Sequence, residues 1–232
     1  MDRKNVAQKF TIQSYKIPPR PPADFEAFAM RTLQQAICSI LGGTPCETSY
    51  EELYQLVLDV CDHKIQSRVY GNLVEQLEQH VVKIFSSLAR SSSNPLEFLP
   101  NMHQAWTGFS ARMHIIESIF VFLDRTYLNG SPVKSLRELG LSLFQRQLIL
   151  HPVVEEKTLQ ALIALIDQER QGETVDETRL RDLICMFAAV QLYQKSFFPL
   201  ILRSTYAFYS SEGKQAIQSL DISSYLQLVQ RR

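Results

Sequence analysis

The chain has 232 residues, of which 45% are hydrophobic, enough for one large helical domain or two small ones. Lys plus Arg and Asp plus Glu number 24 each, so the formal net charge is zero. A balanced chain has no overall attraction to nucleic acid or anionic lipid, and no apolar run approaches the length of a membrane span.

The first 23 residues differ in character from those that follow. Residues 9–17 are rich in β-branched and aromatic side chains, so they can extend as a strand, and the prolines within 18–22 impose a polyproline-like spacer. A disordered leader would be ordinary at a terminus. The apolar content of this leader is higher than a solvated tail needs and favours an extended segment that docks on a partner. The side chains concerned are Phe10, Ile12, Tyr15 and Ile17.

Helical periodicity predicts three helices before residue 90. The first spans about 23–41 and ends at the pair Gly42 and Gly43. The second begins at a capping box, in which Ser49 covers an exposed amide and Glu52 reaches back, and it runs to about His63. The third covers roughly 65–89. The prediction is therefore a series of helices joined by short loops.

A short turn at 96–99 is expected to lead into a longer helix, Met102 to Leu128, which organises the rest. Its middle, residues 119–123, is apolar almost all round, so that part should be buried. Its earlier turns place apolar residues on one stripe beside polar ones, as in a helix that also reaches a partner. The stripe and its polar neighbours are Arg112, Met113, Ile116, Glu117 and Phe120.

Beyond residue 132 the same periodicity continues. Helices are predicted over about 136–148 and 153–170, followed by a long one from about residue 176 that Pro199 should kink or split. Gly213 precedes a last segment over 216–230. The body carries no strand signals. The predicted fold class is all-α, with helices joined by short loops in the manner of a solenoid.

Residues that would carry chemistry do not assemble into a recognisable site. Cys61 and His63 have no second ligand pair nearby to close a zinc site, and Gly42 and Gly43 lead to Pro45 rather than to a phosphate-binding helix start. The four cysteines show no close pairing, and no signal peptide precedes them, which indicates reduced thiols in a cytosolic or nuclear protein. We therefore expect no metal, no cofactor and no enzyme activity.

Several dispersed motifs occur in the order in which one family carries them. They are Ser49-Tyr50-Glu51-Glu52-Leu53-Tyr54-Gln55, Ser118-Ile119-Phe120, Phe122-Leu123-Asp124-Arg125, Glu169-Arg170 with Gly172-Glu173, and Ser196-Phe197. Here the chain resembles the cullins, the elongated scaffolds of ubiquitin ligases. The resemblance implies a stack of five-helix repeats, with residues 24–130 as the first repeat and 131–232 as the second, whole or partial.

The leader with its prolines is similar to the extension of the cullin-4 subgroup. That similarity implies that the partner is the triple β-propeller damaged-DNA-binding adaptor, bound through the leader and the second and fifth helices of the first repeat. The implied contact residues are Phe10, Ile12, Tyr15 and Ile17 in the leader, Tyr50, Leu53, Tyr54 and Val57 in the second helix, and Arg112, Met113, Ile116, Glu117 and Phe120 in the fifth. Some of the nine helical positions should belong to the core, Phe120 first.

The resemblance also implies a non-catalytic scaffold of the nucleus and cytoplasm, without direct nucleic-acid or membrane contact. The RING protein would bind only through a carboxy-terminal part that the cullins have and this chain lacks. Two alternatives stay open at this point. The adaptor could instead be a BTB or Skp-type protein, which should be indifferent to the leader. The chain could also be a helical tethering protein unrelated to ubiquitin.

Overall fold

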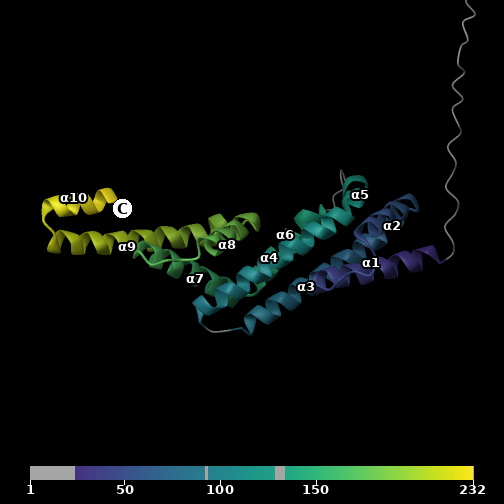
Figure 1. Ribbon diagram of the computed structural model, residues 1–232, viewed down its shortest axis with the longest axis horizontal. Helices are drawn as coiled ribbons and strands as arrows, with labels where there is room; N and C mark the ends of the chain where they lie inside the picture. The colour runs from purple at the N-terminus through teal and green to yellow at the C-terminus, as the bar shows by residue number, and fades with distance from the viewer. Residues whose placement is uncertain (1–23, 92–93, 129–133, 232) are drawn as a thin grey trace, which may run out of the picture.

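The computed structural model describes residues 24–91, 94–128 and 134–231. The helices lie in a long, bent stack, with α1 and α2 at one end and α9 and α10 at the other (Figure 1). Every regular element within the described ranges is helical, which confirms the all-α prediction. The expected strand in the leader lies outside the described residues.

The first three helices are α1 (Phe25–Gly42), α2 (Tyr50–Asp62) and α3 (Gln66–Ala89), close to their predicted bounds. Gly43 ends α1 with a φ of 72°, a left-handed conformation that glycine adopts without strain. The capping box of α2 is present as predicted. The Ser49 hydroxyl accepts a hydrogen bond from the Glu52 amide at 3.2 Å, and the Ser49 amide donates to the Glu52 carboxylate at 3.0 Å.

The central helix differs from its prediction at both ends. It begins as α4 (Pro95–Ile119), earlier than residue 102, because Pro95 suits a helix start and because Phe98 and Leu99 are buried. It is interrupted at Phe120, continues as the short α5 (Val121–Leu123) and ends in the π-helical turn η1 (Asp124–Leu128). The predicted single helix is therefore a long α-helix followed by a short helix and a π-helical turn.

The remaining helices are α6 (Leu136–Leu150), α7 (Pro152–Arg170), α8 (Glu177–Ala189), η2 (Tyr193–Phe197), α9 (Phe198–Ser219) and α10 (Ile222–Arg231). The predicted split lies upstream of Pro199, at Gln191, whose φ is 58°. Gly213 does not end a helix, since α9 passes through it.

No single described helix has the length and apolarity to cross a membrane. The segments Glu177–Ala189 and Tyr193–Ser219 meet these criteria only when taken together, and they are bent relative to each other by 109°.

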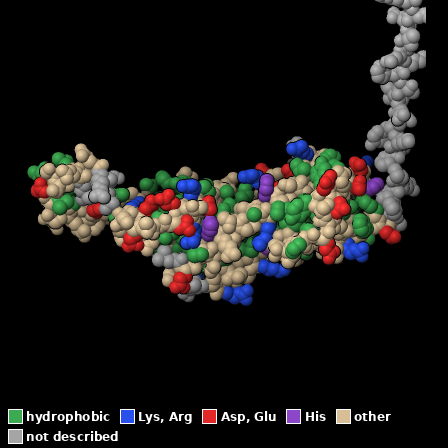
Figure 2. All heavy atoms as spheres, viewed as in Figure 1, with side chains coloured by type: hydrophobic (Ala, Val, Ile, Leu, Met, Phe, Trp, Pro, Cys, Tyr) green, Lys and Arg blue, Asp and Glu red, His purple; other side chains and the backbone are tan. Residues whose placement is uncertain are grey.

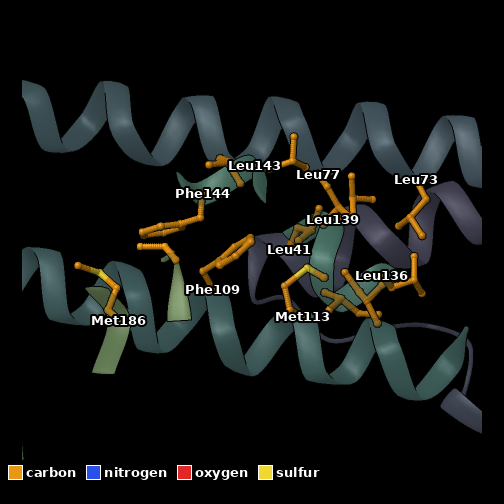
Figure 3. Close-up of a cluster of buried hydrophobic side chains, with 14 of the residues drawn as sticks. Leu41, Leu73, Leu77, Phe109, Met113, Leu136, Leu139, Leu143, Phe144 and Met186 are labelled. Carbon is orange, nitrogen blue, oxygen red and sulfur yellow. The ribbon is translucent and has the colours of Figure 1, made fainter. Parts of the chain in front are cut away.

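An aromatic cluster joins the two halves of the stack. Phe144 of α6 is fully buried, with ring centroids 5.0 Å from Phe85, 5.1 Å from Trp106 and 5.3 Å from Phe109. Figure 3 shows Phe109 and Phe144 as neighbours in the cluster of buried side chains. α4 packs against α1, α2, α3, α6, α7 and α8, so it is shared by both predicted repeats. The division of the repeats at residue 130 stays a prediction.

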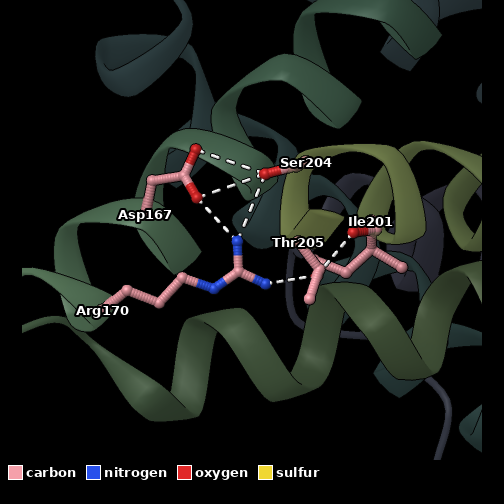
Figure 4. Close-up of polar contacts among 5 residues, drawn as sticks. All are labelled: Asp167, Arg170, Ile201, Ser204 and Thr205. Carbon is pink, nitrogen blue, oxygen red and sulfur yellow. Dashed lines mark hydrogen bonds and ion pairs between the residues drawn. The ribbon is translucent and has the colours of Figure 1, made fainter. Parts of the chain in front are cut away.

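A polar network joins α7 to α9 (Figure 4). The Arg170 guanidinium donates to the Asp167 carboxylate at 2.8 Å, to the Ser204 hydroxyl at 3.3 Å and to the Thr205 hydroxyl at 2.5 Å. The same cation lies 5.5 Å from the ring centroid of Phe208 and 5.7 Å from that of Tyr209. Because this side chain is only 13% exposed, its contacts are largely shielded from solvent and hold α9 against α7.

The aromatic cluster predicts a large cost for truncating Phe144. The substitution Phe144→Ala should lower the free energy of unfolding by about 3–5 kcal/mol, because it removes buried surface and leaves a cavity among three rings. Urea unfolding followed by circular dichroism measures this. Tyr206→Ala, at a position that is 79% exposed, is the control and should change stability by less than about 0.5 kcal/mol. Equal stability of the two variants would contradict the assignment of Phe144 to the core.

Candidate functional site

The two faces of α2 have different surroundings. Leu53 and Val57 are fully buried, because they lie on the stripe that packs against α4 and α5. The prediction that they contact a partner is therefore wrong for this fold. Tyr50 is 51% exposed and Tyr54 is half-buried, so both are placed at the surface. Leu58 follows them at the same four-residue step and is also half-buried.

Three of the predicted contacts on the central helix also lie in the core. Met113 is 5% exposed, Ile116 is fully buried and Phe120 is 1% exposed. Met113 packs against α6 so closely that a Cβ added to Gly140 would lie 2.8 Å from the Met113 methyl group. As surface contacts these three predictions are wrong, whereas the expectation that Phe120 belongs to the core is confirmed.

Arg112 and Glu117 lie next to helices other than α2. The Arg112 guanidinium lies against the glycine that ends α1, with Nη2 3.2 Å from the position of a Cβ on Gly43. Glu117 lines a cavity of about 200 Å³ between α4 and α6, together with Arg137. Burial raises the pKa of the Glu117 carboxyl, and the neighbouring Arg137 opposes that rise. Because α5 has only three residues, the fifth long helix in chain order is α6. Residues 112–119, which were assigned to a fifth helix, lie in α4, the fourth long helix.

The helix edge that does flank α2 carries residues that the sequence prediction missed. The Cys61 thiol near the end of α2 is hydrogen-bonded to the side chain of Thr126, which places η1 beside α2. Phe122 lies one turn before Thr126 and Ile115 two turns before Phe122, and both are half-buried. Tyr50, Tyr54 and Leu58 are four residues apart, so the sequence already indicates that they share one side of α2.

We call the surface formed by Tyr50, Tyr54, Leu58, Ile115 and Phe122 the α2 edge. Its charge is negative, because α2 carries four carboxylates and no base. The hydrogen bonds from the Ser49 amide and hydroxyl lower the pKa of the Glu52 carboxyl. Figure 2 shows hydrophobic and acidic side chains side by side at this end of the molecule. The predicted leader contacts Phe10, Ile12, Tyr15 and Ile17 lie outside the described residues.

The chemistry available at the α2 edge is that of a contact surface. It offers phenol rings, aliphatic side chains and carboxylates, which suit recognition of another macromolecule. Across the described ranges no three His, Cys, Asp or Glu side chains are grouped so that they could hold a metal ion. The pair formed by His103 and Asp182, at 2.7 Å, joins α4 to α8 and lies apart from the α2 edge.

Comparison with known proteins identifies relatives over nearly the whole chain. Residues 30–232 match the family pattern described as the cullin alpha solenoid domain. The chain is 33% identical to human Cullin-4A over 227 residues, which is 97% of this chain and 30% of that relative. It is 32% identical to Cullin-4 of Dictyostelium discoideum, over 95% of this chain and 28% of the relative. Identity to Cullin-3B of Arabidopsis thaliana is 26%, over 97% and 31%. The chain spans about a third of the length of these relatives.

The burial of Ile116 yields a direct prediction. Ile116→Asp should lower the free energy of unfolding by about 3 kcal/mol or more, because an unpaired carboxylate would be placed in the core. Tyr50→Ala should cost less than about 1 kcal/mol, since half of that side chain is already exposed. Thermal unfolding of both variants measures the difference. A soluble Ile116→Asp variant of wild-type stability would contradict the burial.

Stability should also depend on the protonation of His80. Burial, with the nearby Arg112 and Lys83, lowers the pKa of His80 from 6.5 to about 4. The unfolded chain therefore takes up this proton first as pH falls, so stability is complete above pH 6.5 and declines toward pH 4. Because His80 keeps some solvent contact, about 1 kcal/mol is expected. His80→Gln should flatten the curve in this window when unfolding is measured from pH 7 to pH 4. Parallel curves for the two proteins would count against it.

Proposed function

Because the chain belongs to the cullin family, we propose that it is a non-catalytic scaffold module of a cullin-RING ubiquitin ligase. The support is the family match over residues 30–232 and the greater identity to two cullin-4 relatives than to a cullin-3 relative. A long stack of helices with a continuous core is also suited to hold partners at fixed separations. In this proposal the RING protein binds a part of the scaffold that corresponds to the remaining two thirds of the relatives.

The partner of this module, in our proposal, is the triple β-propeller damaged-DNA-binding adaptor. The observation that carries the proposal is the position of Tyr50, which is 51% exposed, and of Tyr54, which is half-buried, on the surface of α2 at one end of the molecule. Large aromatic side chains on an exposed edge are common energetic anchors of interfaces. Two helices and an extended leader together would bury about 1,600 Å² or more in total.

The structure changes which residues should contact the adaptor. Leu53, Val57, Met113, Ile116 and Phe120 are removed from the contact set because they are buried. Tyr50 and Tyr54 remain, with the leader residues Phe10, Ile12, Tyr15 and Ile17. The other members of the α2 edge, Leu58, Ile115 and Phe122, are added because they are half-buried on α2 and on the helices α4 and α5 that pack against it.

Calorimetric titration of the purified propeller adaptor with the chain tests this function. Tyr50→Ala and Tyr54→Ala should each weaken binding about tenfold, the loss typical of an aromatic anchor. Deleting residues 1–17 should weaken binding further without abolishing it. Tyr206→Ala, at the far end of the stack, should bind like the wild type. Undiminished affinity in all three altered proteins would contradict binding through the leader and the α2 edge, and absence of binding by the wild type would exclude this adaptor.

The match to a cullin-3 relative favours one second candidate, a cullin module for a BTB or Skp-type adaptor. The α2 edge would serve the same purpose there, but the leader would not take part. The titration separates the two, since a BTB or Skp-type protein should bind the chain equally well with and without residues 1–17. Binding of such a protein, together with none of the propeller adaptor, would replace the first proposal by the second.

A further inference from the structure

The cavity of about 200 Å³ between α4 and α6 has walls that are largely apolar, and no member of the α2 edge lines it. α4 supplies Trp106, Phe109 and Met113, which follow one another at steps of three and four residues and so share one side of that helix. α6 adds Leu141 and α8 adds Ala189. A hollow with aromatic and aliphatic walls is typical of a site for a small molecule.

Polar side chains from two helices line the same cavity without partners of their own. Ser110 and Glu117 belong to α4 and Arg137 belongs to α6. None of these three side chains forms a hydrogen bond or ion pair within the ranges that the structure describes. A few unpaired polar groups that converge on an apolar cavity are what a bound ligand would satisfy.

The two charged residues of the cavity have opposite signs. The Arg137 guanidinium is near enough to lower the pKa of the Glu117 carboxyl, although burial of that carboxyl outweighs it and raises the pKa. The carboxylate has thus lost part of its hydration without gaining a cation in direct contact. A ligand cation against Glu117 would offset this loss, and a ligand anion would suit Arg137.

Charge restricts the class of ligand. A simple cation would suit Glu117 but would face Arg137 and the exposed His114, whereas a simple anion would face Glu117. A zwitterion with its two charges close together satisfies both residues. Along α4, Glu117 lies one turn beyond Met113 and two turns beyond Phe109, so the charged and the aromatic walls are at different ends.

The size of the cavity restricts the ligand further. Apolar cavities of about 150 Å³ hold a molecule of the size of benzene. A cavity of about 200 Å³ therefore has room for a branched aliphatic side chain beside its charged groups.

We propose that this cavity binds a free α-amino acid with a branched aliphatic side chain, such as leucine. The ammonium group donates to the Glu117 carboxylate, and the Arg137 guanidinium donates to the carboxylate of the amino acid. The aliphatic side chain lies against Met113 and Phe109. This inference goes beyond the proposed function and does not depend on it, because the adaptor is assigned to other residues.

Titration of the full chain with L-leucine tests the proposal. Trp106 is the only tryptophan of the sequence and leucine does not fluoresce, so tryptophan fluorescence reports occupancy of the cavity. A saturable change with a Kd on the order of 0.1–1 mM is expected for a ligand of this size. Leucinamide lacks the carboxylate and 4-methylpentanoate lacks the ammonium group. Each should bind at least about tenfold more weakly than leucine.

Variants locate the binding in the cavity. Glu117→Gln and Arg137→Gln should each weaken leucine binding at least about tenfold, since each removes one charged contact. Ala189→Leu should weaken it as well, because the added side chain occupies the α8 side of the cavity. The matched controls, Glu173→Gln and Arg181→Gln, remove exposed charges outside the cavity and should bind leucine like the wild type. Circular dichroism confirms that each variant keeps its helices.

Three results would overturn the proposal. The first is no saturable change with leucine, and the second is equal leucine affinity in the wild type and both cavity charge variants. The third is equal binding of leucine and leucinamide, which would make the amino terminus of a peptide the ligand in place of a free amino acid. Titration of the adaptor is a separate measurement, so the proposed function can fail or hold whichever result is found.

Discussion

The packing of α4 is the constraint on which the rest of the molecule depends. This helix contacts seven other helices, and the ring of its Phe109 packs against that of Phe144 in α6. α5 follows α4 in the chain, and both helices pack against α2. The packing of α4 therefore also supports the helix that carries Tyr50 and Tyr54.

Local signals in the sequence were sufficient for most of the helix boundaries. The capping box of Ser49 and Glu52 involves only neighbours in the chain, so sequence alone predicts it. Boundaries that depend on distant contacts were missed. Burial of Phe98 holds the first turns of α4 as helix, and the break at Gln191 comes before the proline that was expected to cause it. Tertiary packing decided both cases.

The candidate site was predictable as a region but not residue by residue. Periodicity shows which side chains share a face, yet it does not show which neighbour covers that face. Leu53 and Tyr54 are adjacent in the chain, yet Leu53 is fully buried and Tyr54 only half-buried. On a central helix the problem is greater, since several neighbours cover different faces. Met113 therefore turns to α6 and Arg112 to the end of α1, although a stripe with a partner was expected.

The contacts of Arg170 have a mechanical consequence. They form the joint between α7 and α9, and α9 has 22 residues, so it extends about 33 Å from its start. From Thr205 to Ser219, the last residue of α9, the helix rises about 21 Å, so a tilt of about 10° at this joint would move that end by about 4 Å. The Arg170 guanidinium contacts two hydroxyls and two rings, and these contacts limit how far α9 can tilt relative to α7. Restricting the angle between α7 and α9 at one shielded cation therefore restricts the position of everything attached beyond the far end of α9.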